Sequence, residues 1–136
     1  MRRRWPSMEN KADVRRRNGK NSYLRGYFYE GLAVCLLRSK GYSVIGRNLR
    51  GRRGTSSELD IVAVKNDTLV FAEVKYRKRR DDVYTAITEK SKRRIINAAS
   101  LFIASHPEYA DYQIRFDAVL FSGLFTVEHI KEAFHP

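Results

Sequence analysis

The sequence predicts an α/β fold in which a mixed central sheet is flanked by helices. Apolar residues recur at three- and four-residue spacing in residues 23–40 and 82–105, as in amphipathic helices, and shorter apolar or alternating segments are typical of strands. The expected order is helix, three strands, helix and strand, which indicates a sheet with helices packed against it. With 136 residues, the chain is long enough for one domain and too short for two comfortable ones.

The first element expected to be regular is a helix over residues 23–40. Residues 1–21 lack hydrophobic periodicity and are rich in arginine and lysine, so we expect a flexible basic arm there and a single domain over residues 22–136. Gly41 is typical of a helix stop. The apolar positions that predict this helix are Leu24, Tyr27, Phe28, Gly31, Leu32, Cys35 and Leu36.

The remaining elements follow from local patterns. Residues 42–50 are expected to form the first strand, and residues 57–64 and 69–75 two more, joined by a polar turn at residues 65–68. A second helix is expected over residues 82–105 and is ended by His106-Pro107. Residues 112–121 alternate as a strand. The tail, residues 125–134, is expected to be a short strand or a helical turn that covers a sheet edge.

The charge of the chain predicts a polyanionic partner. The formal net charge is +12, which favours DNA or RNA and, less strongly, an anionic membrane surface. No apolar run approaches the roughly 20 residues of a membrane span, and no secretory signal is visible, so we expect no membrane insertion and a cytoplasmic location. Cys35 is the single cysteine, which excludes an internal disulfide and a cysteine-based zinc site.

Two carboxylates interrupt segments that otherwise look like buried strands. Asp60 and Glu73 stand among valine, isoleucine and phenylalanine, where an ionised group is costly unless something pairs with it. A hairpin with its turn at residues 65–68 would place Asp60 opposite or diagonal to Glu73. Lys75 follows Glu73 by two residues and would project from the same face of its strand.

An acid, a second acid and a lysine at one point are typical of a metal-dependent phosphodiesterase site. Mg²⁺ prefers oxygen ligands and keeps several waters, so Asp60 and Glu73 would suffice as carboxylate ligands, with the carbonyl of Val74 as a third; Mn²⁺ is a substitute. Lys75 would orient the attacking water or stabilise developing negative charge.

Two further carboxylates and a set of basic residues are candidates for the same site. Glu30, in an apolar part of the first helix, is either a solvated glutamate or an additional metal or water ligand. Glu58 precedes Asp60 by two residues and either joins the site or lies at the exposed end of the strand. The basic residues expected to contact nucleic acid are Arg47, Arg50, Arg52, Arg53, Arg77, Lys78, Arg79, Arg80, Lys90 and Lys92.

These motifs together resemble one known family. The order Glu30, Asp60, Glu73-Val74-Lys75 resembles the PD-(D/E)XK nuclease superfamily, and more closely the YraN-like family of predicted bacterial endonucleases, relatives of archaeal Holliday-junction resolvases. The matching stretches lie between Gly26 and Phe121. The resemblance implies a restriction-endonuclease-like fold, with Asp60, Glu73 and Lys75 in the catalytic positions and Glu30 as the helical acid.

Three functions remain open from the sequence. The first is a Mg²⁺-dependent endonuclease acting on DNA, branched or recombination intermediates included. The second is a nucleic-acid-binding module that keeps the nuclease-like fold without turnover. The third is a structural basic protein of a ribonucleoprotein, which gives no reason for Glu73 and Lys75 to share a face. A homodimer is also open, because resolvases that cut symmetrically act as dimers.

Overall fold

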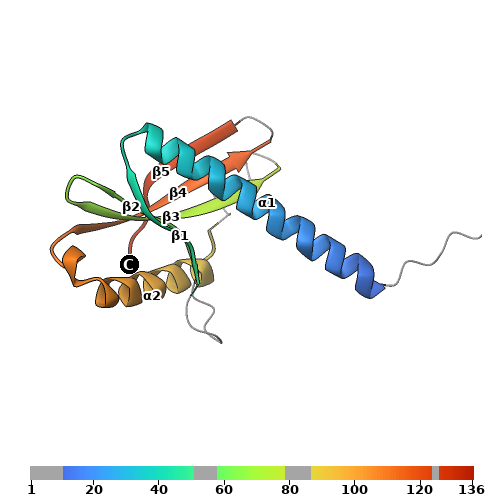
Figure 1. Ribbon diagram of the computed structural model, residues 1–136, viewed down its shortest axis with the longest axis horizontal. Coiled ribbons are helices and arrows are strands. Elements are labelled where there is room, and N and C mark those ends of the chain that lie inside the picture. Colours follow the sequence, from blue (N-terminus) through green and yellow to red (C-terminus); the bar gives the residue numbers. More distant parts are fainter. Residues whose placement is uncertain (1–10, 51–57, 79–86, 124–125) are drawn as a thin grey trace, which may run out of the picture.

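The computed structural model describes residues 11–50, 58–78, 87–123 and 126–136, although the side chains of residues 11–23, 50 and 58 are not among the described parts. A five-stranded sheet carries helix α1 on one face and helix α2 on the other (Figure 1), which confirms the predicted α/β class. The elements are α1 (Lys11–Ser39), β1 (Ser43–Arg50), β2 (Glu58–Lys65), β3 (Thr68–Arg77), α2 (Glu89–Ser105), the 3-10 turn η2 (Pro107–Tyr109), β4 (Gln113–Ser122) and β5 (Thr126–Phe134).

The sheet is mixed, and its strands lie in the order of the sequence, from β1 to β5. Neighbouring strands are antiparallel except β3 and β4, which are parallel and are connected through α2. A parallel pair needs such a crossover, because the chain must return to the same end of the sheet. The tail forms the edge strand β5, so of the two expectations for this segment the strand is confirmed.

The sheet has a core on each face. Alternate residues of β3 separate the two cores: Val70 and Ala72 pack towards α1, while Leu69 and Phe71 pack towards α2. Because β3 is covered on both faces, nearly all of its central residues are apolar. A polar side chain of β3 is therefore either buried beneath one of the two helices or located where neither helix covers the sheet.

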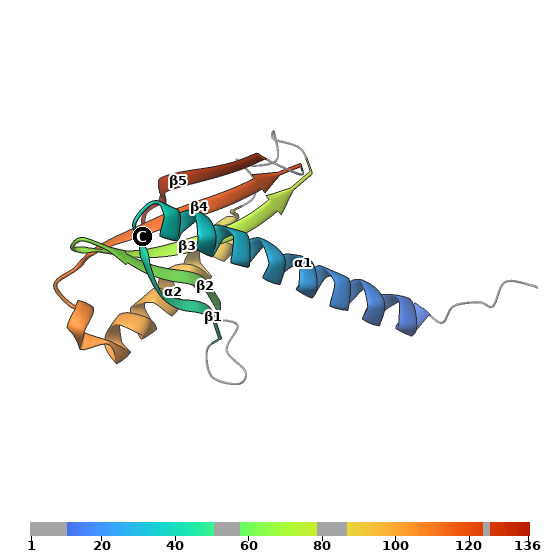
Figure 2. The same ribbon diagram turned by 45° about the horizontal axis from the view of Figure 1, so that its top comes forward.

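α1 begins earlier than the sequence predicts. Its backbone is helical from Lys11, so the expected helix start at residue 23 is wrong; residues 1–10 lie outside the described residues. Arginine, lysine and alanine favour helix by propensity, which requires no apolar stripe. Figures 1 and 2 agree that the N-terminal half of α1 projects beyond the sheet. No helix in the described part of the chain is long and apolar enough to cross a membrane.

The apolar pattern that predicts α1 is not the side of the helix that enters the core. Leu24, Tyr27, Phe28, Leu32 and Cys35 are exposed. The residues of α1 buried against the sheet are Ala33, Val34 and Leu37. Tyr29 and Leu36 pack against the same core, so the apolar residues of α1 divide between the core and the exposed surface.

α2 begins later than predicted, at Glu89. Thr88 is its N-cap, and the Thr88 side chain accepts a hydrogen bond of 3.1 Å from the backbone N–H of Ser91. The expected start at residue 82 lies in a segment outside the described residues. Ile95, Ala98 and Ala99 of α2 pack on the sheet.

Candidate functional site

The strands β2 and β3 separate at Asp60. Their backbone pairing extends from the turn as far as Ile61 and Ala72 and includes no pair for Asp60 or Glu73. Leu59 packs in the core beneath α2, whereas Ile61, two residues later, packs in the core beneath α1. In a regular strand these two side chains would share a face, so β2 must twist locally at Asp60.

The carboxylate of Asp60 fills the gap between the separating strands. Its Oδ2 accepts a hydrogen bond of 2.9 Å from the backbone N–H of Val74, a residue that is not paired with β2. This bond fixes the Asp60 side chain beside β3. The predicted proximity of Asp60 to Glu73 is therefore present, although the two residues are not a cross-strand pair in the sheet.

Glu73 is a buried carboxylate next to two cations. It is 3% exposed, and its Oε1 lies 3.2 Å from Nζ of Lys75 and 3.8 Å from Nη2 of Arg94. Burial raises the pKa of Glu73 to about 8 and the nearby Asp60 adds to this, while Lys75 acts in the opposite direction. The pair with Lys75 does not compensate for the loss of solvent, so the site favours additional positive charge.

A pocket of about 570 Å³ lies at the point where β2 and β3 separate, here called the β2–β3 fork. It is lined by Asp60, Glu73, Val74 and Lys75 of the strands and by residues of both helices, including Glu30 of α1 and Arg94 of α2. Asp60 lies between the strands, so groups from the α1 side and the α2 side of the sheet border one space. The structure thus brings together Glu30, Asp60, Glu73, Val74 and Lys75, the residues that the sequence singles out as catalytic or metal-binding.

The donor set suits a hard divalent cation. Asp60 and Glu73 supply carboxylate oxygens, and Mg²⁺ needs only one or two of these when water and substrate complete its shell. Burial, and then the neighbouring Asp60, raise the pKa of Glu73 to about 8, so a cation bound beside Glu73 would favour its ionised form. Among the described residues no three His, Cys, Asp or Glu side chains form a metal cluster, so the remaining ligands would be a carbonyl, water or substrate oxygen. Val74, whose carbonyl the sequence offers as a third ligand, also lines the pocket.

The predicted basic residues other than Arg47 lie in the pocket, on the surface or outside the described residues. Arg77 lines the pocket, and Arg25, which the sequence does not single out, lines it as well. Lys78 and Lys90 are exposed, and Lys92 lies 3.0 Å from Glu89 in the first turn of α2. The other predicted groups, the side chains of Arg50, Arg52, Arg53, Arg79, Arg80 and Glu58, lie outside the described residues.

Arg47 has a structural role that the sequence does not predict. Its Nη2 donates a hydrogen bond of 2.9 Å to the backbone carbonyl of Tyr27, and its guanidinium lies 4.4 Å from the centre of the Tyr27 ring. Gly31 leaves the space for this group, because a Cβ there would lie 3.3 Å from the guanidinium. Arg47 therefore joins β1 to α1.

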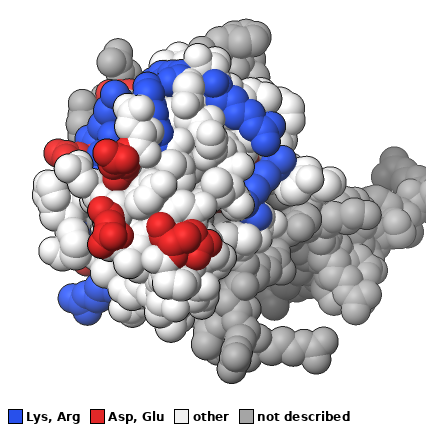
Figure 3. Space-filling model, turned by 60° about the vertical axis from the view of Figure 1, so that its left-hand side comes forward, with Lys and Arg blue, Asp and Glu red and all other residues white. Residues whose placement is uncertain are grey.

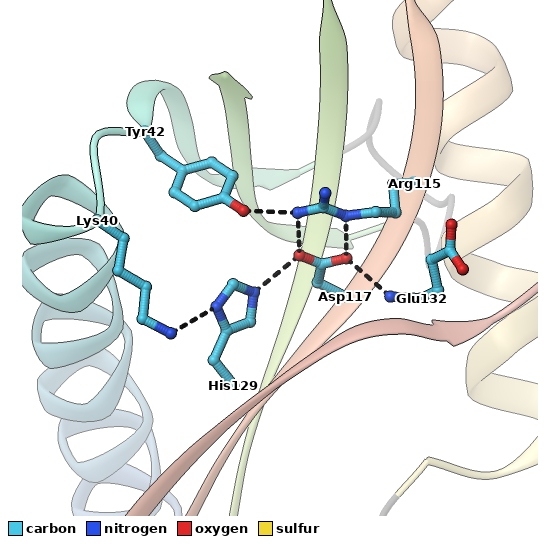
Figure 4. A network of polar contacts seen from close by, with 6 residues as sticks. All are labelled: Lys40, Tyr42, Arg115, Asp117, His129 and Glu132. Carbon is cyan, nitrogen blue, oxygen red and sulfur yellow. Dashed lines mark hydrogen bonds and ion pairs between the residues drawn. The ribbon is translucent and has the colours of Figure 1, made fainter. Parts of the chain in front are cut away.

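A second buried polar group, absent from the sequence predictions, lies on the face of the sheet that α1 covers (Figure 4). Asp117 is fully buried and accepts hydrogen bonds from Nε and Nη2 of Arg115, each 2.8 Å long, and from the backbone N–H of Glu132. His129 Nε2 lies 2.8 Å from Asp117, and Lys40 Nζ lies 3.1 Å from His129 Nδ1. The ammonium of Lys40 can only donate, so the imidazole carries its proton on Nε2 and donates to Asp117.

This second group holds the fold together and is separate from the pocket. Arg115 also donates a hydrogen bond of 2.6 Å to the hydroxyl of Tyr42, so the contacts of Asp117 connect β4, β5 and the segment after α1. Asp117 and Arg115 alternate with apolar residues, and this alternation predicts the strand but not the burial of the pair. The signal that could have identified a buried pair is the fully apolar sequence after Asp117, from Ala118 to Phe121.

Charge is distributed unevenly over the molecule. Asp and Glu side chains gather at the end that carries the β2–β3 turn and η2, while Lys and Arg form a band along the upper edge of the same view (Figure 3). The exposed acids of these segments include Asp67, Glu108 and Asp111. The pocket lies at the opposite end of β3, roughly 20 Å away at about 3.3 Å per residue.

Comparison with known proteins finds one family. A family model described as "Uncharacterised protein family UPF0102" matches residues 29–121, which include the pocket residues from Tyr29 to Arg94. A UPF0102 protein of Rhodopseudomonas palustris (strain BisB18) is 38% identical over 113 residues, 83% of this chain and 82% of that protein. A UPF0102 protein of Azorhizobium caulinodans is 39% identical over 119 residues, 88% of each chain.

Proposed function

The chain belongs to the UPF0102 family, and from this premise and the geometry of its pocket we propose that it is a Mg²⁺-dependent endonuclease acting on DNA, branched or recombination intermediates included. The observation that carries the proposal is the fork between β2 and β3. There two carboxylates from different strands meet beside Lys75, in a pocket whose other charged residues are mostly arginines.

Asp60 and Glu73 would hold the metal, with the carbonyl of Val74 as a third ligand and Mn²⁺ as a substitute for Mg²⁺. When bound, the metal would acidify a coordinated water and neutralise charge on the phosphate. The hydrogen bond from Val74 N–H keeps Asp60 in place, so the first ligand is oriented before the metal arrives. Hydrolysis adds the water oxygen to phosphorus and breaks one ester P–O bond, with a proton ending on the leaving oxygen.

Lys75 and Glu30 border the same space and would serve the water and the phosphate. Nζ of Lys75 lies 3.2 Å from Glu73, so its positive charge is beside the position where negative charge develops. Glu30, from α1, borders the pocket and would accept a hydrogen bond from the attacking water or from a water bound to the metal. Arg25 and Arg77 would bind phosphates that flank the cleaved bond.

A cleavage assay tests the proposal. The wild-type protein would be incubated with labelled single-stranded, duplex, flapped and four-way-junction DNA, and with RNA, in Mg²⁺, Mn²⁺ or EDTA. We expect metal-dependent products that Asp60→Asn reduces at least about a hundredfold, while DNA binding persists. Asp67→Asn is the matched control, because it makes the same change in the exposed turn at the far end of β3.

The outcomes separate the candidate functions. Products that require metal and disappear in Asp60→Asn alone would support the endonuclease. Folded wild-type protein that binds the same DNA without cleaving any substrate, in any metal, would refute it and favour the binding module. Equal activity in Asp60→Asn and Asp67→Asn would show that the fork between β2 and β3 is not the catalytic site.

A further inference from the structure

Arg94 reaches the pocket from the side opposite α1. It lies in the second turn of α2, its side chain is 35% exposed, and it lines the pocket together with Asp60, Glu73 and Lys75. Its neighbour Arg93 is exposed, because successive helical residues point about 100° apart and Ile95 occupies the buried side of α2. Packing of α2 on the sheet thus directs one of two adjacent arginines into the pocket.

The guanidinium of Arg94 has unused hydrogen-bonding capacity. Its Nε is enclosed and has no hydrogen-bond partner within the described part of the structure. Its Nη2 lies 3.8 Å from Oε1 of Glu73, which is an ion-pair distance but too long for a hydrogen bond. Burying an N–H donor without a partner is costly, so the arrangement indicates a ligand that is bound there in the working protein.

The charge of the pocket indicates which ligand this is. Four cationic residues line it, Arg25, Lys75, Arg77 and Arg94, against three carboxylates, Glu30, Asp60 and Glu73. A divalent cation on Asp60 and Glu73 would leave an excess of positive charge next to Arg94. The guanidinium presents parallel N–H donors that match two oxygens of one phosphate, which the single ammonium of a lysine does not.

We propose that Arg94 binds non-bridging oxygens of the phosphate that is cleaved and stabilises the charge that develops on it. This inference rests on the proposed endonuclease function and adds a substrate-binding residue that sequence patterns do not identify. Arg94 and the metal ligands contact the phosphate from different elements, α2 and the β2–β3 fork. The phosphate is thereby fixed between them.

Three variants test this role. Arg94→Ala removes the guanidinium, and Arg94→Lys keeps the charge without the paired, coplanar N–H donors. Arg93→Ala removes the same charge from the exposed neighbouring position. DNA affinity is measured by fluorescence anisotropy in EDTA, and cleavage by single-turnover rates at saturating protein over a range of Mg²⁺ concentrations. Thermal unfolding of each variant establishes that it is folded.

We expect Arg94→Ala to weaken DNA binding about tenfold, since a hydrogen bond to a charged group is lost, and Arg93→Ala to weaken it no more than about twofold. The maximal cleavage rate should fall about a hundredfold or more in Arg94→Ala, and Arg94→Lys should recover only part of it. The Mg²⁺ concentration that gives half the maximal rate should stay unchanged.

Other outcomes would overturn the assignment. Equal loss of binding in Arg94→Ala and Arg93→Ala would show that Arg94 contributes only general positive charge. If high Mg²⁺ restores the cleavage rate of the Arg94→Ala variant to that of the wild type, Arg94 only orients Glu73. If the wild-type protein cleaves nothing, the endonuclease proposal fails, and the comparison of the two alanine variants in EDTA still decides whether Arg94 binds phosphate.

Discussion

Replacing Glu73 by glutamine is expected to stabilise the metal-free protein, even though it removes a proposed metal ligand. Burial and the nearby Asp60 raise the pKa of Glu73 from 4.5 to about 8. Between these values the folded protein keeps a proton that the unfolded chain releases, so the free energy of unfolding falls as the pH rises. This contribution to stability is complete below pH 4.5 and is lost as the pH passes through 8.

The size of the effect follows from the pKa difference. At pH 7 the distance from the unfolded value is 7 minus 4.5, or 2.5 units, which at roughly 1.4 kcal/mol per unit is on the order of 3 kcal/mol. For a chain of this size, that corresponds to roughly 10 °C in the melting temperature. Glu73→Gln avoids this cost, so its advantage should be largest near pH 8 and absent near pH 4.5.

Thermal unfolding followed by circular dichroism measures this difference. Wild type, Glu73→Gln and the exposed control Glu108→Gln would be compared in EDTA between pH 4.5 and 8. Mg²⁺ should then stabilise the wild type, by about 2.7 kcal/mol at a hundred times its dissociation constant, and stabilise Glu73→Gln less. If Glu73→Gln is less stable than the wild type in EDTA at every pH, the argument is refuted, because Glu73 is then ionised and satisfied by Lys75.

Three further predictions concern the buried network and the charge of the pocket. Asp117→Ala should lower the free energy of unfolding by about 3–5 kcal/mol in urea titrations, because Arg115 and His129 lose their shared buried acceptor; an unchanged value would contradict the network. Burial alone would raise the pKa of Asp117, but hydrogen bonds from His129 and Arg115 hold it below its usual 3.8. The contribution of Asp117 to stability is therefore complete above pH 3.8 and is lost as the pH falls through the lowered pKa. Between pH 6 and 2, Asp117→Asn should therefore lose less stability than the wild type. A parallel loss in both proteins would count against the assignment. Arg25→Gln should reduce the slope of log affinity for DNA against log salt by about 0.9, the value for one phosphate contact, and no change would remove Arg25 from the interface.

The elements of the sheet could be predicted because their signals are local. The hairpin of β2 and β3 follows from two apolar runs and a four-residue polar turn, and so does the approach of Asp60 to Glu73, but not the separation of the strands at Asp60. The start of α2 could not be predicted from periodicity, since the periodic pattern does not mark where Thr88 caps the helix. The start of α1 was predicted too late, because residues 11–21 form a helix without the apolar stripe on which the prediction depends.

The sequence by itself determined the fold class and the meeting of Asp60, Glu73 and Lys75, because alternation along a strand and the length of a turn are properties of neighbouring residues. The tertiary structure alone decided which side chains are covered. It buried Asp117 against His129, turned Arg47 towards α1, and brought Arg94 rather than Arg93 to the pocket. Burial depends on the element that packs on a given face, and that element comes from a distant part of the chain.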